Sequence, residues 1–137
     1  MQHSHAVTDS DTRFIINPTT RQVRNDGSRK VSLIQYDHNS ERFTFECPKY
    51  IEGHDMGKCN RVEIHYVNID TQTKQQHTGV YVADDLTESG DVVTCSWLIS
   101  NNATQLVGVL SFVVRYTCVV DDTVTYAWSS AVTTVNI

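Results

Sequence analysis

Residues 108–120 read Gly-Val-Leu-Ser-Phe-Val-Val-Arg-Tyr-Thr-Cys-Val-Val. Every second residue of this stretch is apolar, and one side carries Leu110, Phe112, Val114, Tyr116 and Cys118. A period of two is typical of a β-strand with one face in the core. The sequence therefore predicts a long strand here, and the other segments are interpreted around it.

The same alternation recurs along the chain. It is clearest in 41–47, 61–69, 91–99 and 123–129, and it is weaker in 13–16, 31–36, 80–83 and 132–137. Turn-forming residues such as Asp, Asn, Ser and Gly separate these segments, and no long helical stripe is visible. This pattern predicts an all-β fold, an antiparallel β-sandwich of about eight strands.

The chain length of 137 residues favours a single domain. Residues 1–28 are more polar than the remainder. We therefore expect an extended N-terminal arm over 1–28, followed by a β-sandwich domain over 29–137.

Charge and hydropathy exclude several partner classes. The chain has 11 basic and 16 acidic residues, a net charge of −5, and no strong basic cluster, so we expect no nucleic acid partner. Its apolar runs are far shorter than the roughly 20 residues that span a bilayer, so we expect no membrane insertion. Residues 1–11 contain no apolar leader, which favours folding in a cytoplasm.

The four cysteines are Cys47, Cys59, Cys95 and Cys118. None forms a Cys-x-x-Cys pair of the kind that zinc sites often contain, and three lie in alternating apolar segments. We predict four reduced thiols that act as small apolar side chains, with a disulfide as the alternative.

No catalytic or metal-binding constellation stands out. Glu63 and His65 share a strand face but offer only two ligands, and the pairs Asp84-Asp85 and Asp121-Asp122 are more typical of turns than of calcium sites. Asp37, His38 and Ser40 have the residue types of a nucleophilic triad, but no Gly-x-Ser-x-Gly elbow accompanies them. We predict no enzyme activity, no catalytic residue, no cofactor and no metal requirement.

Tyr116-Thr117-Cys118 resembles the Tyr-x-Cys of an immunoglobulin strand, with Cys47 or Cys95 as the upstream partner. Without a sign of secretion, we interpret this tripeptide as ordinary core patterning.

The second face of the long strand carries Val109, Val113 and Val119, which is more apolar than a solvated face requires. Either a loop or another subunit must cover it. The arm carries its own apolar run, Phe14-Ile15-Ile16. We predict that these six residues contact neighbouring chains; the alternative is that the arm folds back over its own sandwich and covers the same valines.

The order of several stretches resembles that in small β-rich structural proteins of tailed phages of gut Gram-positive bacteria, and in the N-terminal domain of the phage baseplate upper protein family. The resemblance covers nearly all of the chain from Arg13 onward. The stretches concerned are 16–21, 37–45, 48–56, 59–62, 95–99, 108–112 and 126–128. The resemblance implies a β-sandwich that docks onto a virion and helps to present host-binding parts.

We therefore expect a virion component of the baseplate, tail fibre or head fibre, made in the cytoplasm of a bacterial host. Its expected partners are other virion proteins, copies of itself and a host surface glycan or receptor. The alternative function is a carbohydrate- or receptor-binding module. Its platform would be exposed aromatic residues such as Tyr50, Tyr81 or Trp128, although for Trp128 a core position is favoured.

Overall fold

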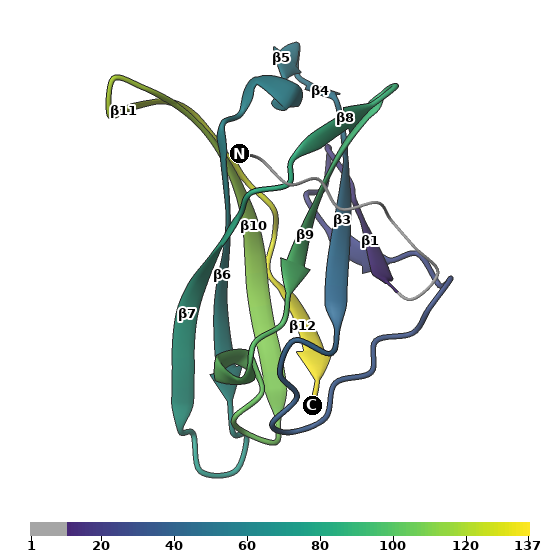
Figure 1. Cartoon of the computed structure of the whole chain (residues 1–137), viewed down its shortest axis with the longest axis vertical. Helices are drawn as coiled ribbons and strands as arrows, with labels where there is room; N and C mark the ends of the chain where they lie inside the picture. Colours follow the sequence, from purple (N-terminus) through teal and green to yellow (C-terminus); the bar gives the residue numbers. More distant parts are fainter. Residues whose placement is uncertain (1–10) are drawn as a thin grey trace.

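The computed structural model describes residues 11–137, and within them the chain is all-β. These residues form twelve strands and two 3-10 helical turns, η1 (Met56–Lys58) and η2 (Asn101–Ala103), and no α-helix. The strands gather into two five-stranded sheets and one small hairpin (Figure 1).

The first sheet has the strand order β2-β1-β3-β9-β8. β1 pairs with β3 in parallel, and the other neighbours pair antiparallel. The bounds of its strands are β1 Thr12–Ile16, β2 Val23–Asn25, β3 Arg42–Pro48, β8 Thr87–Ser89 and β9 Val92–Leu98.

The second sheet has the strand order β11-β10-β6-β7, and β12 pairs with the first half of β10. Its pairs are all antiparallel. Its strands are β6 Arg61–Ile69, β7 Gln76–Ala83, β10 Val109–Val120, β11 Thr123–Ser129 and β12 Thr133–Asn136. The hairpin of β4 (Tyr50–Ile51) and β5 (His54–Asp55) lies at one end of the molecule, at the top of Figure 1.

The two sheets face each other across one aromatic core. Phe112 of the second sheet is the centre of this core: its ring centroid lies 5.4–6.0 Å from four rings of the first sheet. Those rings belong to Phe14, Phe43, Phe45 and Trp97. Tilted and edge-on contacts of this kind add to the free energy of burying the rings.

The long strand that the alternation predicts is confirmed as β10. Leu110, Phe112, Val114 and Tyr116 are buried, and Cys118 is half-buried near the end of the strand. The predicted segments 61–69 and 123–129 coincide with β6 and β11. The segment 80–83 is the second half of a longer strand, β7, whose first half is polar and alternates less clearly.

The prediction of a strand over 31–36 is wrong. Tyr36 has a positive φ of 71°, and the backbone turns there because Asp37 N–H donates to Ile34 O at 3.0 Å. The Ile34 N–H donates to the Asp37 carboxylate, so a local side chain takes the place of a neighbouring strand. Of this segment, Leu33 is buried and Ile34 is exposed.

The prediction of an arm over 1–28 is corrected for the described residues. β1 lies inside the first sheet between β2 and β3, and Phe14 and Ile16 are only 2 % and 1 % exposed. The boundary at residue 28 therefore does not separate an arm from a domain, since both sides of it share one core. Residues 1–10 lie outside the description.

Within residues 11–137 we find no helix that is long and apolar enough to cross a membrane.

Candidate functional site

The outer side of the second sheet carries an apolar stripe. On β6, Ile64 and Tyr66 face the core, so the residues that precede and follow them in the sequence point outward. Residues of β7 and β10 alternate between the two sides in the same way. Direct register partners point to the same side of a sheet, and Val80 and Val113 are both partners of His65. We call the following set the outer valine face: Val67, Val80, Val82, Val113 and Val132.

This face is open to solvent. Val80 is 52 % exposed and Val132 is 67 % exposed. A shallow hollow of about 250 Å³ lies between Val67, Val113 and Val132, and His65 and Ser111 complete its surface. Full burial of a valine is worth about 1.5 kcal/mol or more, so covering this face would yield several kcal/mol.

A small polar network borders the outer valine face. Glu63 accepts one hydrogen bond from Arg61 Nε at 2.7 Å and interacts with His65 Nε2 at 3.1 Å. The Arg61 hydrogen bond lowers the pKa of Glu63, with a smaller contribution in the same direction from His65. A charged rim beside an apolar centre is the usual anatomy of a protein interface.

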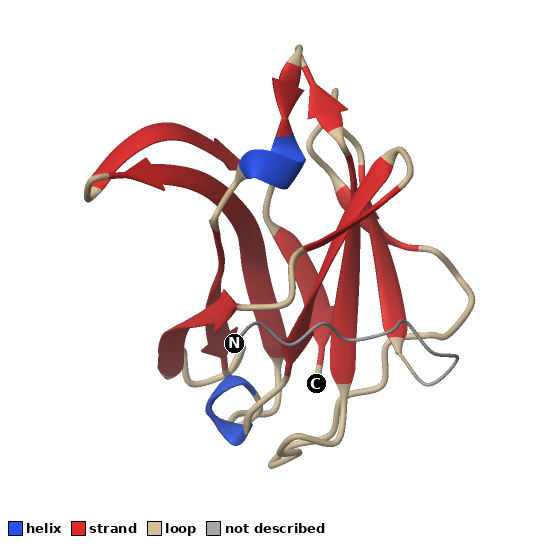
Figure 2. Cartoon of the chain, turned by 45° about the horizontal axis from the view of Figure 1, so that its top comes forward, coloured by secondary structure: helices blue, strands red, loops and turns tan. Residues whose placement is uncertain are grey.

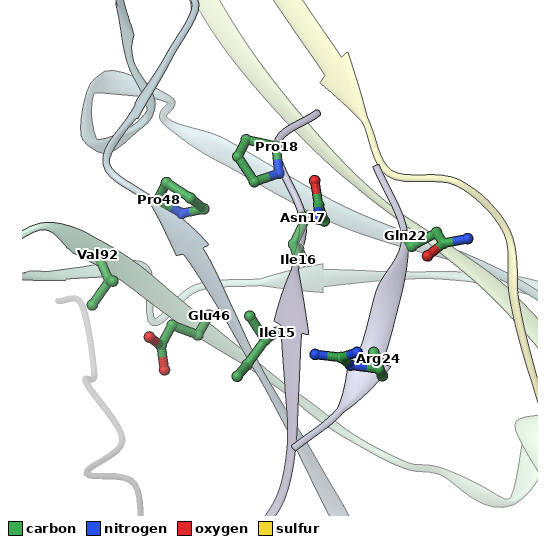
Figure 3. Close-up of a pocket in the computed structure, with 9 residues that line it drawn as sticks. All are labelled: Ile15, Ile16, Asn17, Pro18, Gln22, Arg24, Glu46, Pro48 and Val92. Atoms are coloured by element: carbon green, nitrogen blue, oxygen red, sulfur yellow. The ribbon is translucent and has the colours of Figure 1, made fainter. Parts of the chain in front are cut away.

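A second hollow lies on the opposite outer surface, over the first sheet (Figure 3). It has a volume of about 290 Å³, and Ile15, Pro18, Pro48 and Val92 give it an apolar lining. Ile15 is 43 % exposed and lies between its register partners Arg24 and Glu46.

The predicted interface residues are therefore not brought together. Phe14 and Ile16 belong to the core, and Ile15 lies on the outer side of the first sheet. Val109 and Val113 point outward from the second sheet and are partly exposed. In the part of the arm that the structure describes, β1 and β2 are strands of the other sheet and do not cover these valines.

Val119 lies in a different setting, on the hairpin of β10 and β11 that reaches beyond the rest of the molecule in both views (Figures 1 and 2). A register irregularity between Cys118 and Val119 bends this hairpin. Val119 pairs with Val124, which is exposed, as is Val120. The hairpin is thus a second, separate apolar surface.

The structure also brings together three side chains that we did not connect from the sequence. The Cys118 sulfur lies 3.5 Å from the Cys59 sulfur and 3.6 Å from His54 Nε2, and the three ligand atoms all lie within 4.8 Å of one another. Burial, and after it the hydrogen bond with Cys118, raise the pKa of Cys59 to about 12. The expectation that no three ligands meet is therefore corrected.

One sequence signal could have found part of this cluster. His54 and Cys59 are separated by four residues, which falls within the ligand spacing of zinc sites. The third residue, Cys118, lies 59 residues further along the chain, and only the fold brings it beside Cys59.

The other candidates have structural roles. Asp85 is buried and accepts hydrogen bonds from the backbone and the hydroxyl of Ser96, so it stabilises β9. Asp121 and Asp122 both have a positive φ in the tight turn between β10 and β11. Of the proposed aromatic platform, Trp128 is buried against Arg21, Tyr81 is packed against the core, and only Tyr50 is exposed.

Comparison with family models, curated proteins and solved structures gives no match to this chain.

Proposed function

We propose that the chain is a structural component of a tailed-phage virion, an attachment domain of the baseplate, tail fibre or head fibre. It assembles by placing the outer valine face against a neighbouring chain, in the first instance a second copy. The outer valine face carries this proposal: an apolar stripe crosses three strands, and residues 11–137 leave it uncovered.

The strand order supports this kind of module. In immunoglobulin-type sandwiches one sheet has the order A-B-E-D and the other G-F-C-C′. Taking β3 as strand B, the two sheets follow these orders as β1-β3-β9-β8 and β11-β10-β6-β7. We therefore propose an immunoglobulin-type sandwich, with two departures: β1 runs parallel to β3, and the cysteines on β3 and β10, Cys47 and Cys118, are free thiols.

The second sheet of this arrangement is well suited to pairing. Continuous pairing of β6 with β7 and with β10 aligns the outward-pointing residues in rows across the sheet. One such row is formed by Val80, His65 and Val113. The row places a valine on each side of His65, and His65 contacts Glu63, so a partner face would bury apolar area beside a polar contact that is already paired.

The carbohydrate-binding alternative has less support. A sugar platform needs aromatic faces that are exposed together, and the structure exposes only Tyr50 of the three that were considered. Carbohydrate binding is therefore one possible outcome of the glycan-array experiment below.

Quantitative mass spectrometry of purified particles from the phage that encodes the chain tests the virion assignment. We expect the polypeptide at a fixed copy number relative to the major capsid protein. Abundant polypeptide in the infected-cell lysate, combined with its absence from washed particles, would refute the assignment. A glycan array probed with the purified chain identifies the carbohydrate-binding outcome.

A further inference from the structure

Three side chains that are soft or borderline metal ligands lie together at the end of the molecule that holds the β4–β5 hairpin: His54, Cys59 and Cys118. Asp55 caps η1 by accepting a hydrogen bond from Gly57 N–H at 2.9 Å, and Cys59 follows directly after this turn. The next residue, Asn60, connects the segment to β10: its amide donates to Val119 O and accepts from Val119 N–H, both at 2.8 Å. Cys59 is thereby held beside Cys118.

The third side chain is positioned by a ring contact. The His54 imidazole stacks on Tyr126 of β11, and Tyr126 is the register partner of Cys118. The Tyr126 hydroxyl reaches the Met56 sulfur at 3.9 Å, which connects the stacked pair to the buried side of η1. Four elements, β5, η1, β10 and β11, therefore converge on this point.

Two of the three separations agree with those of a tetrahedral metal site, and the third, between the Cys59 sulfur and the His54 ligand nitrogen, is no more than 4.8 Å. Zinc binds Cys sulfur at about 2.3 Å and His nitrogen at about 2.0–2.1 Å, which places two sulfurs about 3.8 Å apart and a sulfur and a nitrogen about 3.6 Å apart. The corresponding separations here are 3.5 Å for Cys59 and Cys118, and 3.6 Å for Cys118 and His54.

We propose that His54, Cys59 and Cys118 form a zinc-binding site, with Nε2 and two thiolate sulfurs as ligands. Two thiolates and one imidazole are the donor set that zinc favours over the hard cations calcium and magnesium. Cys59 is buried, while His54 and Cys118 are partly exposed, so the fourth tetrahedral position opens toward solvent and takes a water molecule.

The site links the connection between the two sheets to the projecting β10–β11 hairpin. Zinc there acts as a clip: it ties the β4–β5–η1 segment to the base of the hairpin and neutralises the two sulfurs, each of which loses its proton on binding. This inference is independent of the virion assignment, since it concerns only ligand geometry within one chain.

Cobalt substitution tests the site. The full chain is reduced, freed of metal with a chelator and titrated with Co²⁺. We expect one Co²⁺ per chain, thiolate-to-cobalt charge-transfer bands in the near ultraviolet and visible bands of tetrahedral intensity. One equivalent of Zn²⁺ should remove all of these bands.

Variants assign the ligands. His54→Ala, Cys59→Ser and Cys118→Ser should each abolish the tetrahedral bands and weaken Zn²⁺ binding by more than about 100-fold, since even outer-shell changes cost 10–100-fold. The matched controls are His77→Ala, on β7, and Cys95→Ala, in the core; both should bind as the wild type does. Cys118 is partly exposed, so Cys118→Ser should stay folded by near-ultraviolet circular dichroism.

Three results would overturn the proposal. One is a folded, reduced wild type that shows no tetrahedral cobalt spectrum. Another is a spectrum that persists unchanged in the folded Cys118→Ser variant. The third is a native Cys59–Cys118 disulfide, which would appear as two thiols instead of four on titration in denaturant without reductant.

Discussion

The imidazole of His54 lies almost parallel to the phenol ring of Tyr126, with ring centroids 3.5 Å apart and ring planes inclined by 11°. The contact joins the β4–β5 hairpin to β11 and sets the direction in which Nε2 points. Outer-shell contacts of this kind orient metal ligands and commonly change affinity by 10–100-fold.

Removal of that ring should therefore weaken zinc binding without removing a ligand. We expect Tyr126→Ala to weaken Zn²⁺ binding by about 10-fold or more, and Tyr126→Phe, which keeps the ring, to bind nearly as the wild type does. Competition with a chromophoric chelator measures both. Equal weakening by both variants would show that the hydroxyl, and not the stacking, orients His54.

The thiols should differ in reactivity in the metal-free protein. Burial raises the pKa of Cys47 to about 12 and raises that of Cys95 as well, and a thiol of pKa 12 is only about one part in ten thousand ionised at pH 8. Because the thiolate is the nucleophile, neither should react with a thiol reagent in the native state, whereas the partly exposed Cys118 should react first. Peptide mapping after a short alkylation checks this order, and early labelling of Cys95 would contradict it.

The aromatic core should depend on Phe112. Phe112→Ala removes contacts with four rings, and we expect a loss of about 3–5 kcal/mol in the free energy of unfolding. Val120→Ala, on the exposed part of the hairpin, should change it by less than about 0.5 kcal/mol. Chemical denaturation followed by tryptophan fluorescence gives both values; similar values for the two variants would place the core elsewhere.

The first strand should be necessary for folding. A chain that lacks residues 1–20 loses β1 from the interior of a sheet, and with it two buried side chains, Phe14 and Ile16. We expect this truncated chain to lose its cooperative unfolding transition. A sharp transition at wild-type stability would instead mean that these residues form a dispensable arm.

Strands in which apolar and polar residues alternate strongly can be predicted from the sequence, and strands without that alternation cannot. β10 and β6 are evident because apolar residues repeat at every second position over a long run. β1 is short, preceded by polar residues and followed by Pro18, so its central place in the sheet follows only from tertiary pairing with β3.

The outer valine face and the cluster of His54, Cys59 and Cys118 also differ in how far the sequence predicts them. Val113 can be recognised as outward-facing from the alternation of one strand, without any knowledge of the fold. The association of Cys59 with Cys118 depends on hydrogen bonds of Asn60 to β10 and on a bent hairpin, and neither leaves a local signal in the sequence.

The state of association in solution tests the outer valine face most directly. Light scattering across a concentration series should show the mass of the wild type rising above the 15.5 kDa of one chain. Val113→Asp should remain at the monomer mass while keeping the wild-type circular dichroism spectrum, because a carboxylate at the centre of the face cannot be buried unpaired. Ile34→Asp, which places the same charge on an exposed loop residue, should associate as the wild type does. A wild type that stays at 15.5 kDa at every concentration, or a folded Val113→Asp variant that associates normally, would contradict assembly through this face.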